Sequence, residues 1–221
     1  MEDVGGDKDT NVGLTYRALL LTEAAWLFNL AEGEALTGRI LQIYQSGLST
    51  RGRFLTSLSN DLHRYYRTLC VDYRYKIEQA NKDWAIRNMK LRHSRKLWQL
   101  SNLCLQCAAA AQGTVDDHDG MLAEHIRKPP LLKLVTAMRE TGGLALCADV
   151  WELYDAFLHL IRQESVRTAL SGVEYDQRDE SEEFMRLQDN AKSFDRATQR
   201  VVEHFFESKK HRSYLIRFGV L

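Results

Sequence analysis

Four cysteines and seven histidines are the side chains of this chain best suited to bind a metal or act as nucleophiles. Cys104 and Cys107 form a CxxC pair, a spacing found in zinc sites and in thiol oxidoreductases. A structural zinc site usually takes four protein ligands, and this pair lies inside an apolar run next to four alanines. We therefore expect both cysteines to be small core residues with reduced thiols.

The acidic and histidine-containing motifs have the wrong spacing for metal ligation. Residues 116–120 read Asp-Asp-His-Asp-Gly, but placing Gly120 at the sixth position of an EF-hand loop puts Val115 and Ile126 at ligand positions. No histidine falls in an HExxH or ExxH pattern. Asp155 and His159 share a helix face, a pairing more typical of a surface hydrogen bond. The sequence predicts neither a metal nor a cofactor.

Catalytic signatures are missing as well. The chain contains no GxSxG, P-loop, GxGxxG or kinase-like string. We therefore expect a protein that is not an enzyme and has no small-molecule substrate. A helical enzyme with dispersed catalytic residues is the last of the alternatives.

Charge is unevenly distributed along a chain whose thirty basic and thirty acidic side chains cancel. Between Arg64 and Lys96, ten lysines and arginines stand against three acids. If this segment is one helix, six of the cations fall within an arc of about 80°. They are Arg64, Arg67, Arg74, Lys82, Arg92 and Lys96. Such an arc is either a solvated face or a surface for polyanions, meaning nucleic-acid phosphates or anionic lipid.

The elements that carry these residues are predicted to be helical. Sixty residues from Arg53 to Gln112 contain no glycine or proline, the residues that most often end helices. One straight helix of that length would span about 90 Å, so the segment must bend, break or protrude. Residues 14–32, 97–111 and 144–170 are apolar on most or all sides and should form the core.

We predict an all-α fold, an irregular bundle of about six or seven helices around one very long central helix that is bent or protruding. Residues 1–12 should be a disordered acidic tail, residues 13–208 a single bundle domain, and residues 209–221 a basic and then apolar tail. The acidic start and the absence of an apolar run long enough for a bilayer favour an intracellular location without a transmembrane segment.

Two apolar series are candidates for protein binding. The expected final helix, residues 181–208, has the cleanest heptad pattern, with Phe184, Phe194 and Phe205 on one face. That face should pack against another helix, within the bundle or across a homodimer. The terminal segment supplies the second series, namely Tyr214, Ile216 and Phe218, which either dock on the bundle itself or bind a partner.

These features favour a non-enzymatic interaction or scaffold subunit of a larger macromolecular assembly. Its partners would be other protein subunits, including a second copy of the chain. The first alternative is a nucleic-acid-binding helical protein that uses the basic face of residues 64–96. The second is a helical dimer that binds membrane surfaces.

Overall fold

The computed structural model describes residues 10–45, 54–78 and 83–216, and within these ranges it contains helices and no strand, which confirms the all-α class. Its α-helices outnumber the six or seven expected. They are α1 (Asn11–Thr22), α2 (Leu30–Gln45), α3 (Thr56–Glu78), α4 (Trp84–Lys90), α5 (Lys96–Ala110), α6 (Val115–His125), α7 (Pro130–Glu140), α8 (Cys147–Arg162), α9 (Glu164–Ser171), α10 (Glu182–Glu207) and α11 (Lys209–Tyr214). A π-helical segment, Leu91–Arg95, joins α4 to α5, and 3₁₀ turns cover Leu144–Leu146 and Tyr175–Glu180.

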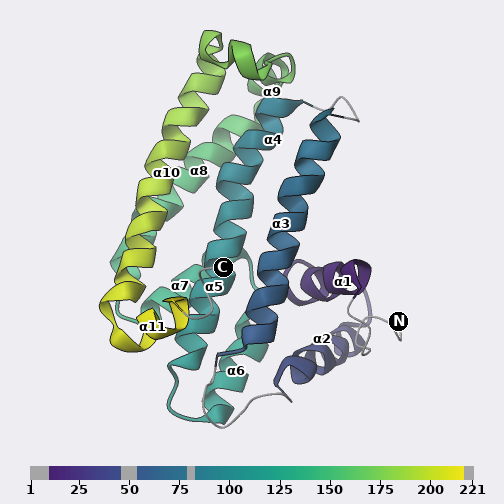
Figure 1. The fold of residues 1–221 in the computed structure, drawn as a ribbon, viewed down its shortest axis with the longest axis vertical. Coiled ribbons are helices and arrows are strands. Elements are labelled where there is room, and N and C mark those ends of the chain that lie inside the picture. Colours follow the sequence, from purple (N-terminus) through teal and green to yellow (C-terminus); the bar gives the residue numbers. More distant parts are fainter. Residues whose placement is uncertain (1–9, 46–53, 79–82, 217–221) are drawn as a thin grey trace.

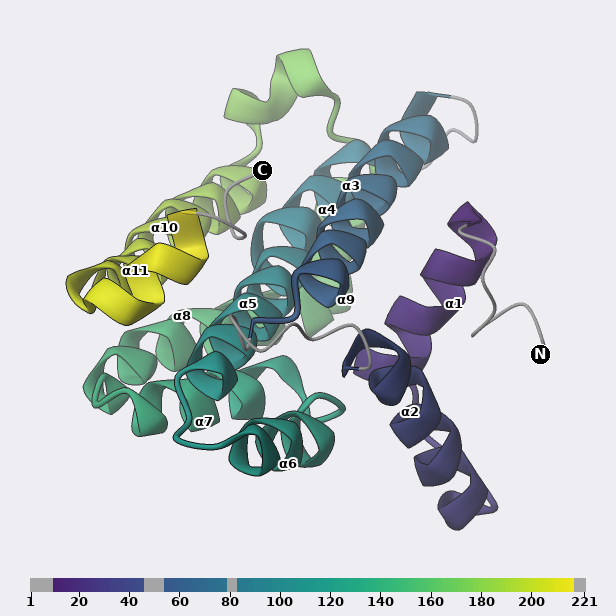
Figure 2. The same cartoon turned by 60° about the horizontal axis from the view of Figure 1, so that its bottom comes forward.

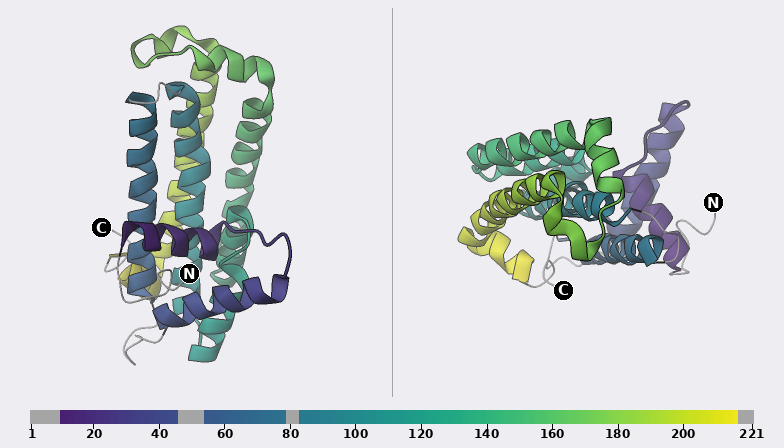
Figure 3. Two further views of the ribbon diagram at one scale, coloured as in Figure 1. Left: turned by 90° about the vertical axis from the view of Figure 1, so that its right-hand side faces the viewer. Right: turned by 90° about the horizontal axis from the view of Figure 1, so that it is seen from above.

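Four long rods give the molecule its shape (Figure 1). The first is α3, and the second is the continuous helix that runs from α4 through the π segment to α5. The other two are α8 and α10. Figure 3 shows these rods side by side, with α1 and α2 crossing them near one end. Figure 2 shows α6 and α7 gathered around α5 at that same end. The described part of the sixty-residue run without glycine or proline therefore contains two antiparallel helices, α3 and α4–α5, rather than one long rod.

Helix α5 is the centre of the larger of two hydrophobic clusters, because twelve of its fifteen residues are buried. Its alanines let α7 approach closely, and Cys104 and Cys107 are almost fully buried beside them. Burial raises the pKa of the Cys107 thiol to about 12, so this thiol stays protonated and apolar in character. The prediction that these cysteines are core residues is confirmed.

The smaller cluster lies at the other end of the rods, between α4, α8, α9 and α10. His93, in the π segment, stands between the two clusters and is completely buried. Its ring stacks on Phe157 with centroids 4.0 Å apart. Nδ1 lies 2.8 Å from the Met89 carbonyl oxygen, and burial lowers the pKa of the imidazole. The neutral ring therefore donates its Nδ1 proton to that carbonyl.

Two expected core helices are shorter than predicted. The chain turns back after Thr22, so residues 14–32 do not form one buried helix. The turn is needed because a buried network ties α1 and α2 to one stretch of α3: the Asp61 carboxylate accepts hydrogen bonds from Arg17 at 3.0 Å and from the Tyr44 hydroxyl at 2.6 Å. Residues 144–170 break at Gln163, whose extended ψ of 129° redirects α9 to cover the smaller cluster.

Two local patterns mislead about where helices begin. Residues 113–120, whose two glycines and acidic run predict a loop, overlap α6, which begins after Thr114, whose side chain accepts a hydrogen bond from the Asp117 amide. Asp179, with Glu182 three residues later, resembles a capping box, but α10 is capped by Ser181, whose hydroxyl oxygen accepts from the Phe184 amide at 3.3 Å. Asp179 falls instead in the preceding 3₁₀ turn, too early to reach the first free amides of the helix.

Candidate protein-interaction surface

The heptad face of α10 is used inside the bundle. Phe184, Phe194 and Phe205 are each at most 1% exposed, and α10 packs along α8. Phe184 belongs to the smaller cluster, and Phe194 and Phe205 to the larger one. The expectation that this face packs against another helix is met within one chain. The assignment of the three phenylalanines to a partner-binding surface is wrong, because no partner could reach them in the folded protein.

The C-terminal residues also dock on their own bundle. The Tyr214 ring stacks on Phe54 with centroids 5.6 Å apart, and Leu215 is only 4% exposed. The Lys210 ammonium donates to the Ala111 carbonyl oxygen at 2.7 Å, which places a cation at the C-terminal end of α5. Of the other two predicted residues, Ile216 is 58% exposed and Phe218 lies outside the described residues.

The predicted polyanion-binding cations that the structure describes do not form one arc, because α3 and α4 run in opposite directions. Arg64 lies 3.6 Å from the Asp61 carboxylate, and Arg74 pairs with Glu78 at 2.7 Å. Arg67 is exposed on α3, and Lys82 lies outside the described residues.

The two cations of the α4–α5 rod turn toward α10. The Asp195 carboxylate accepts from Arg92 at 3.0 Å and from Lys96 at 2.7 Å. Burial alone would raise the pKa of Asp195, but these two hydrogen bonds lower it below its ordinary value. Arg92 and Lys96 therefore hold α10 against the central rod, and the structure separates them from the cations of α3.

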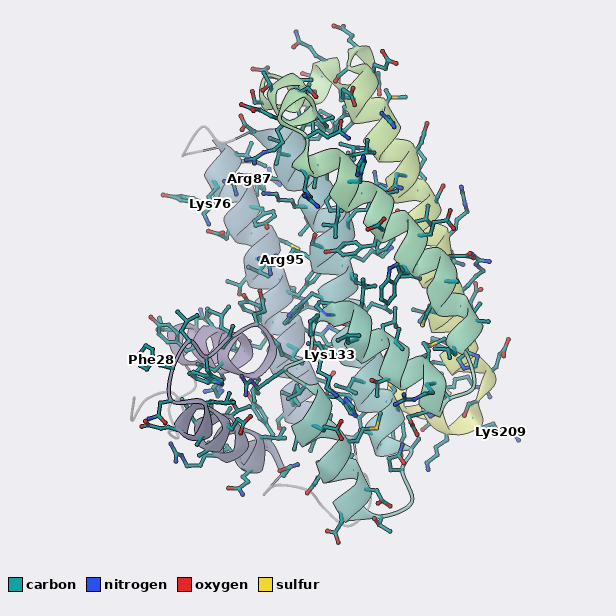
Figure 4. All side chains as sticks on the ribbon, turned by 180° about the vertical axis from the view of Figure 1, so that it is seen from behind. Phe28, Lys76, Arg87, Arg95, Lys133 and Lys209 are labelled. Atoms are coloured by element: carbon teal, nitrogen blue, oxygen red, sulfur yellow. The ribbon has the colours of Figure 1, made fainter. Side chains whose placement is uncertain are left out.

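The most exposed apolar residues lie in the turn between α1 and α2. Leu27 is 92% exposed and Phe28 85%, and Leu30, the first residue of α2, is 57% exposed. Figure 4 shows Phe28 projecting from the edge of the molecule, away from the rods. Single exposed apolar residues are ordinary, but adjacent large ones that fold outward are typical of an interaction site. We call residues 24–30 the apolar turn.

One aromatic residue of the apolar turn, Trp26, points inward and anchors it. Its ring lies against Gly33 of α2 so closely that a Cβ at position 33 would overlap the indole. On the other side, the Arg127 guanidinium sits 5.5 Å from the centre of the indole ring. The indole is therefore held between α2 and the segment that follows α6, while the next two side chains face outward.

The ends of the apolar turn are fixed as well. At its start, Glu23 accepts hydrogen bonds from the Tyr65 hydroxyl at 3.1 Å and from Arg95 at 2.9 Å. At its end, Asn29 adopts a left-handed conformation with φ of 51°, and its side-chain amide donates to Glu32. These contacts restrain the turn at both ends and at Trp26.

The pattern of the sequence concealed this turn. Residues 24–31 contain one polar side chain, Asn29, so the run resembles a buried helix. Asn29 is the residue that could have indicated the turn, because asparagine is several-fold enriched among non-glycine residues at positive φ. The inward contact of Trp26 depends on Arg127, one hundred and one positions away, and no local pattern could indicate it.

Other chemistry has little support in the described ranges. Their side chains include no group of three or more His, Cys, Asp or Glu residues placed to share a metal ion. None of their helices has both the length and the apolar composition needed to cross a bilayer. A surface pocket of about 560 Å³ lies between α8 and α10. Two of its charged lining residues, Arg200 and Asp149, already form an ion pair with each other. Comparison with known protein families, with curated proteins and with solved structures found no match to this chain.

Proposed function

We propose that the protein is a non-enzymatic interaction subunit that binds another protein through Leu27 and Phe28 of the apolar turn. The observation that carries this proposal is their exposure, 92% and 85%, on a turn whose neighbouring residue Trp26 is anchored. Large apolar side chains in a fixed conformation are the usual anchors of protein interfaces, because burying each releases about 1.5–3 kcal/mol. The partner must therefore offer an apolar pocket at least two side chains wide.

Acidic residues near the turn favour a protein over an anionic membrane. Glu32 lies in the first turn of α2 and Glu34 follows it on the same helix, and both are exposed. Carboxylates in this position would repel a surface of anionic lipid, whereas arginine and lysine at the rim of a protein pocket would complement them. The described cations do not favour the nucleic-acid alternative, since Arg92 and Lys96 are engaged by Asp195.

The test compares three immobilised proteins in extracts of the native source: wild type, the double variant Leu27→Ser/Phe28→Ser, and Val71→Ser. Val71 is a matched control because it is also an exposed apolar residue, at 69%, but lies on α3. We expect at least one protein to be retained by wild type and by Val71→Ser and to be lost from the double variant. Circular dichroism should show the same helicity for all three.

Two results would contradict this proposal. One is that all three immobilised proteins retain the same set, which would show that the apolar turn contributes nothing specific. The other is that wild type retains no protein above the level of an unrelated helical control. Any retained partner should then bind in purified form, with an affinity at least tenfold weaker for the double variant.

A further inference from the structure

Helix α3 has a packed first half and an uncovered second half. Leu58, Leu62 and Tyr65 are buried in the larger cluster. From residue 66 to residue 78 no side chain is buried, and none after Leu69 packs on either cluster. By contrast, α10 keeps buried residues along its whole length. The second half of α3 therefore lacks the support that a helix in a small domain usually has.

This half nonetheless has an apolar face. Tyr66, Leu69, Tyr73 and Ile77 recur at intervals of three and four, so they lie on one side of the helix. All four are half-buried rather than buried, which leaves part of each apolar surface in water. By the same helical spacing, Lys76 lies on one flank of this face and Arg74 on the other.

Helix α4 adds cations beside the same face. The Arg87 guanidinium lies 5.6 Å from the centre of the Tyr73 ring, and Tyr73 also forms a side-chain hydrogen bond with Arg95. Figure 4 shows Lys76, Arg87 and Arg95 following one another along α3 and α4 on one side of the molecule. Apart from Arg92, which turns toward Asp195 on α10, residues 66–78 and 84–95 hold six lysines and arginines against two acids, and one of the six, Arg95, also pairs with Glu23. The half-covered apolar face therefore has a cationic border.

We propose that the second half of α3, with the adjoining side of α4, binds an acidic amphipathic helix of a partner protein. The apolar face of that helix would cover Leu69, Tyr73 and Ile77, and its carboxylates would approach the bordering cations. Thirteen residues of α3 extend for about 20 Å, which matches a partner helix of three to four turns. This surface is separate from the apolar turn and does not depend on the function proposed above.

An amphipathic helix fits the observations better than a nucleic acid does. Phosphates would contact the cations but would leave the apolar face uncovered. The two acids on this half of α3 are already paired, Asp72 with Lys76 at 2.6 Å and Glu78 with Arg74 at 2.7 Å, so they favour neither ligand. Binding of RNA is therefore an outcome that the experiment must be able to detect.

The experiment measures the fluorescence anisotropy of labelled probes added to the full chain. The first probe is a 21-residue peptide with leucine at the a and d heptad positions and glutamate at most others. The second has lysine in place of glutamate, and the third is a 20-nucleotide single-stranded RNA. We expect only the glutamate peptide to bind, with an affinity that falls at least fivefold between 50 and 300 mM salt.

Variants locate the binding. Ile77→Ser should weaken binding of the glutamate peptide at least tenfold. Thr68→Ala, on the opposite side of α3, should leave the affinity for this peptide unchanged. Arg87→Glu should weaken binding of the glutamate peptide and allow the lysine peptide to bind. Partial unfolding could not produce this exchange of preference. The Leu27→Ser/Phe28→Ser variant should bind the probe as wild type does, which separates this proposal from the function proposed above.

Three results would overturn the proposal. One is that the glutamate peptide does not bind at 1 mM protein. Another is that Ile77→Ser and Arg87→Glu bind it as tightly as wild type. The third is that RNA binds and the glutamate peptide does not, which would assign the surface to a polyanion instead.

Discussion

Replacing Lys133 with methionine should make the stability of the protein less dependent on pH. Lys133 is completely buried on α7, and its amine donates to the Asn102 side-chain oxygen at 2.8 Å and to the Ile126 carbonyl at 3.1 Å. These two acceptors suit a neutral amine, which has two protons to donate, better than an ammonium with three. Burial lowers the pKa of Lys133 from 10.5 to about 7, and the carboxylate of Glu23 offsets this in part.

The sign of the pH effect follows from that shift. Between pH 7 and pH 10.5 the unfolded chain holds the lysine proton more tightly than the folded chain, so stability rises with pH in this window. The whole shift corresponds to about 5 kcal/mol, of which about 2 kcal/mol falls between pH 7 and pH 9. Methionine cannot titrate, but it leaves the acceptors on Asn102 and Ile126 without a donor, at a cost of about 1–3 kcal/mol each.

The assay is urea unfolding followed by circular dichroism at pH 7 and at pH 9. The variant should lie within about 2 kcal/mol of wild type at pH 7, because the removed burial cost and the lost hydrogen bonds oppose each other. At pH 9 it should fall a further 2 kcal/mol or so behind wild type. Buried cysteine and tyrosine groups also titrate, but they do so in both proteins and cancel in the difference.

Lys192 provides the control, because its side chain is 52% exposed. Lys192→Met should show the same difference from wild type at both pH values. If the difference between Lys133→Met and wild type were constant within about 0.5 kcal/mol from pH 7 to pH 9, Lys133 would have an ordinary pKa and the reasoning from its burial would be refuted.

Three further predictions, which use five substitutions, test the packing. Phe194→Ala should lower the free energy of unfolding by about 3–5 kcal/mol, and a loss below about 1 kcal/mol would contradict its burial. Gly33→Ala should destabilise by about 1–3 kcal/mol because its Cβ overlaps the indole that anchors the apolar turn. Gly38→Ala, with open space around it on the same helix, should instead stabilise by up to about 1 kcal/mol, and equal effects would refute the overlap. Leu215→Ala should lower the free energy of unfolding by about 2–5 kcal/mol, and Ile216→Ala by less than about 0.5 kcal/mol. Thermal or urea unfolding measures both, and the reverse order would contradict the docking of the C-terminus.

Local patterns predicted helical class and the strongest heptad well. The seven-residue series in α10 is buried from Phe184 to Phe205, because a regular apolar face on a long helix has few alternatives to packing inward. The absence of glycine and proline correctly indicated helix across residues 56–78 and 84–110, but it could not place the reversal between them. A chain can reverse without either residue, and tertiary packing of the two halves determines where it does so.

The candidate site was not predictable in the same way. Whether an apolar run is buried depends on whether another part of the fold covers it. The hydrogen bonds of Arg17 and Tyr44 to Asp61 fix α1 and α2 on α3, and in that arrangement Leu27 and Phe28 remain exposed. The cationic arc was lost for a related reason. Regular helical spacing puts Arg92 and Lys96 on the same face as Arg64. In the folded chain they face α10 instead, where Asp195, about one hundred residues later, accepts hydrogen bonds from both.

The π-helical segment determines how the two hydrophobic clusters are oriented to each other. One extra residue in a helical turn rotates everything beyond it by about 100° around the axis. Ala85 and Met89, before the segment, face the smaller cluster, and Leu97 and Trp98, after it, face the larger one. Deleting one residue between 91 and 95 would restore regular α-helix but turn one cluster's side chains away from their partners. The length of this segment therefore sets the angular phase of the whole rod, and substitutions there should be tolerated better than a change of length.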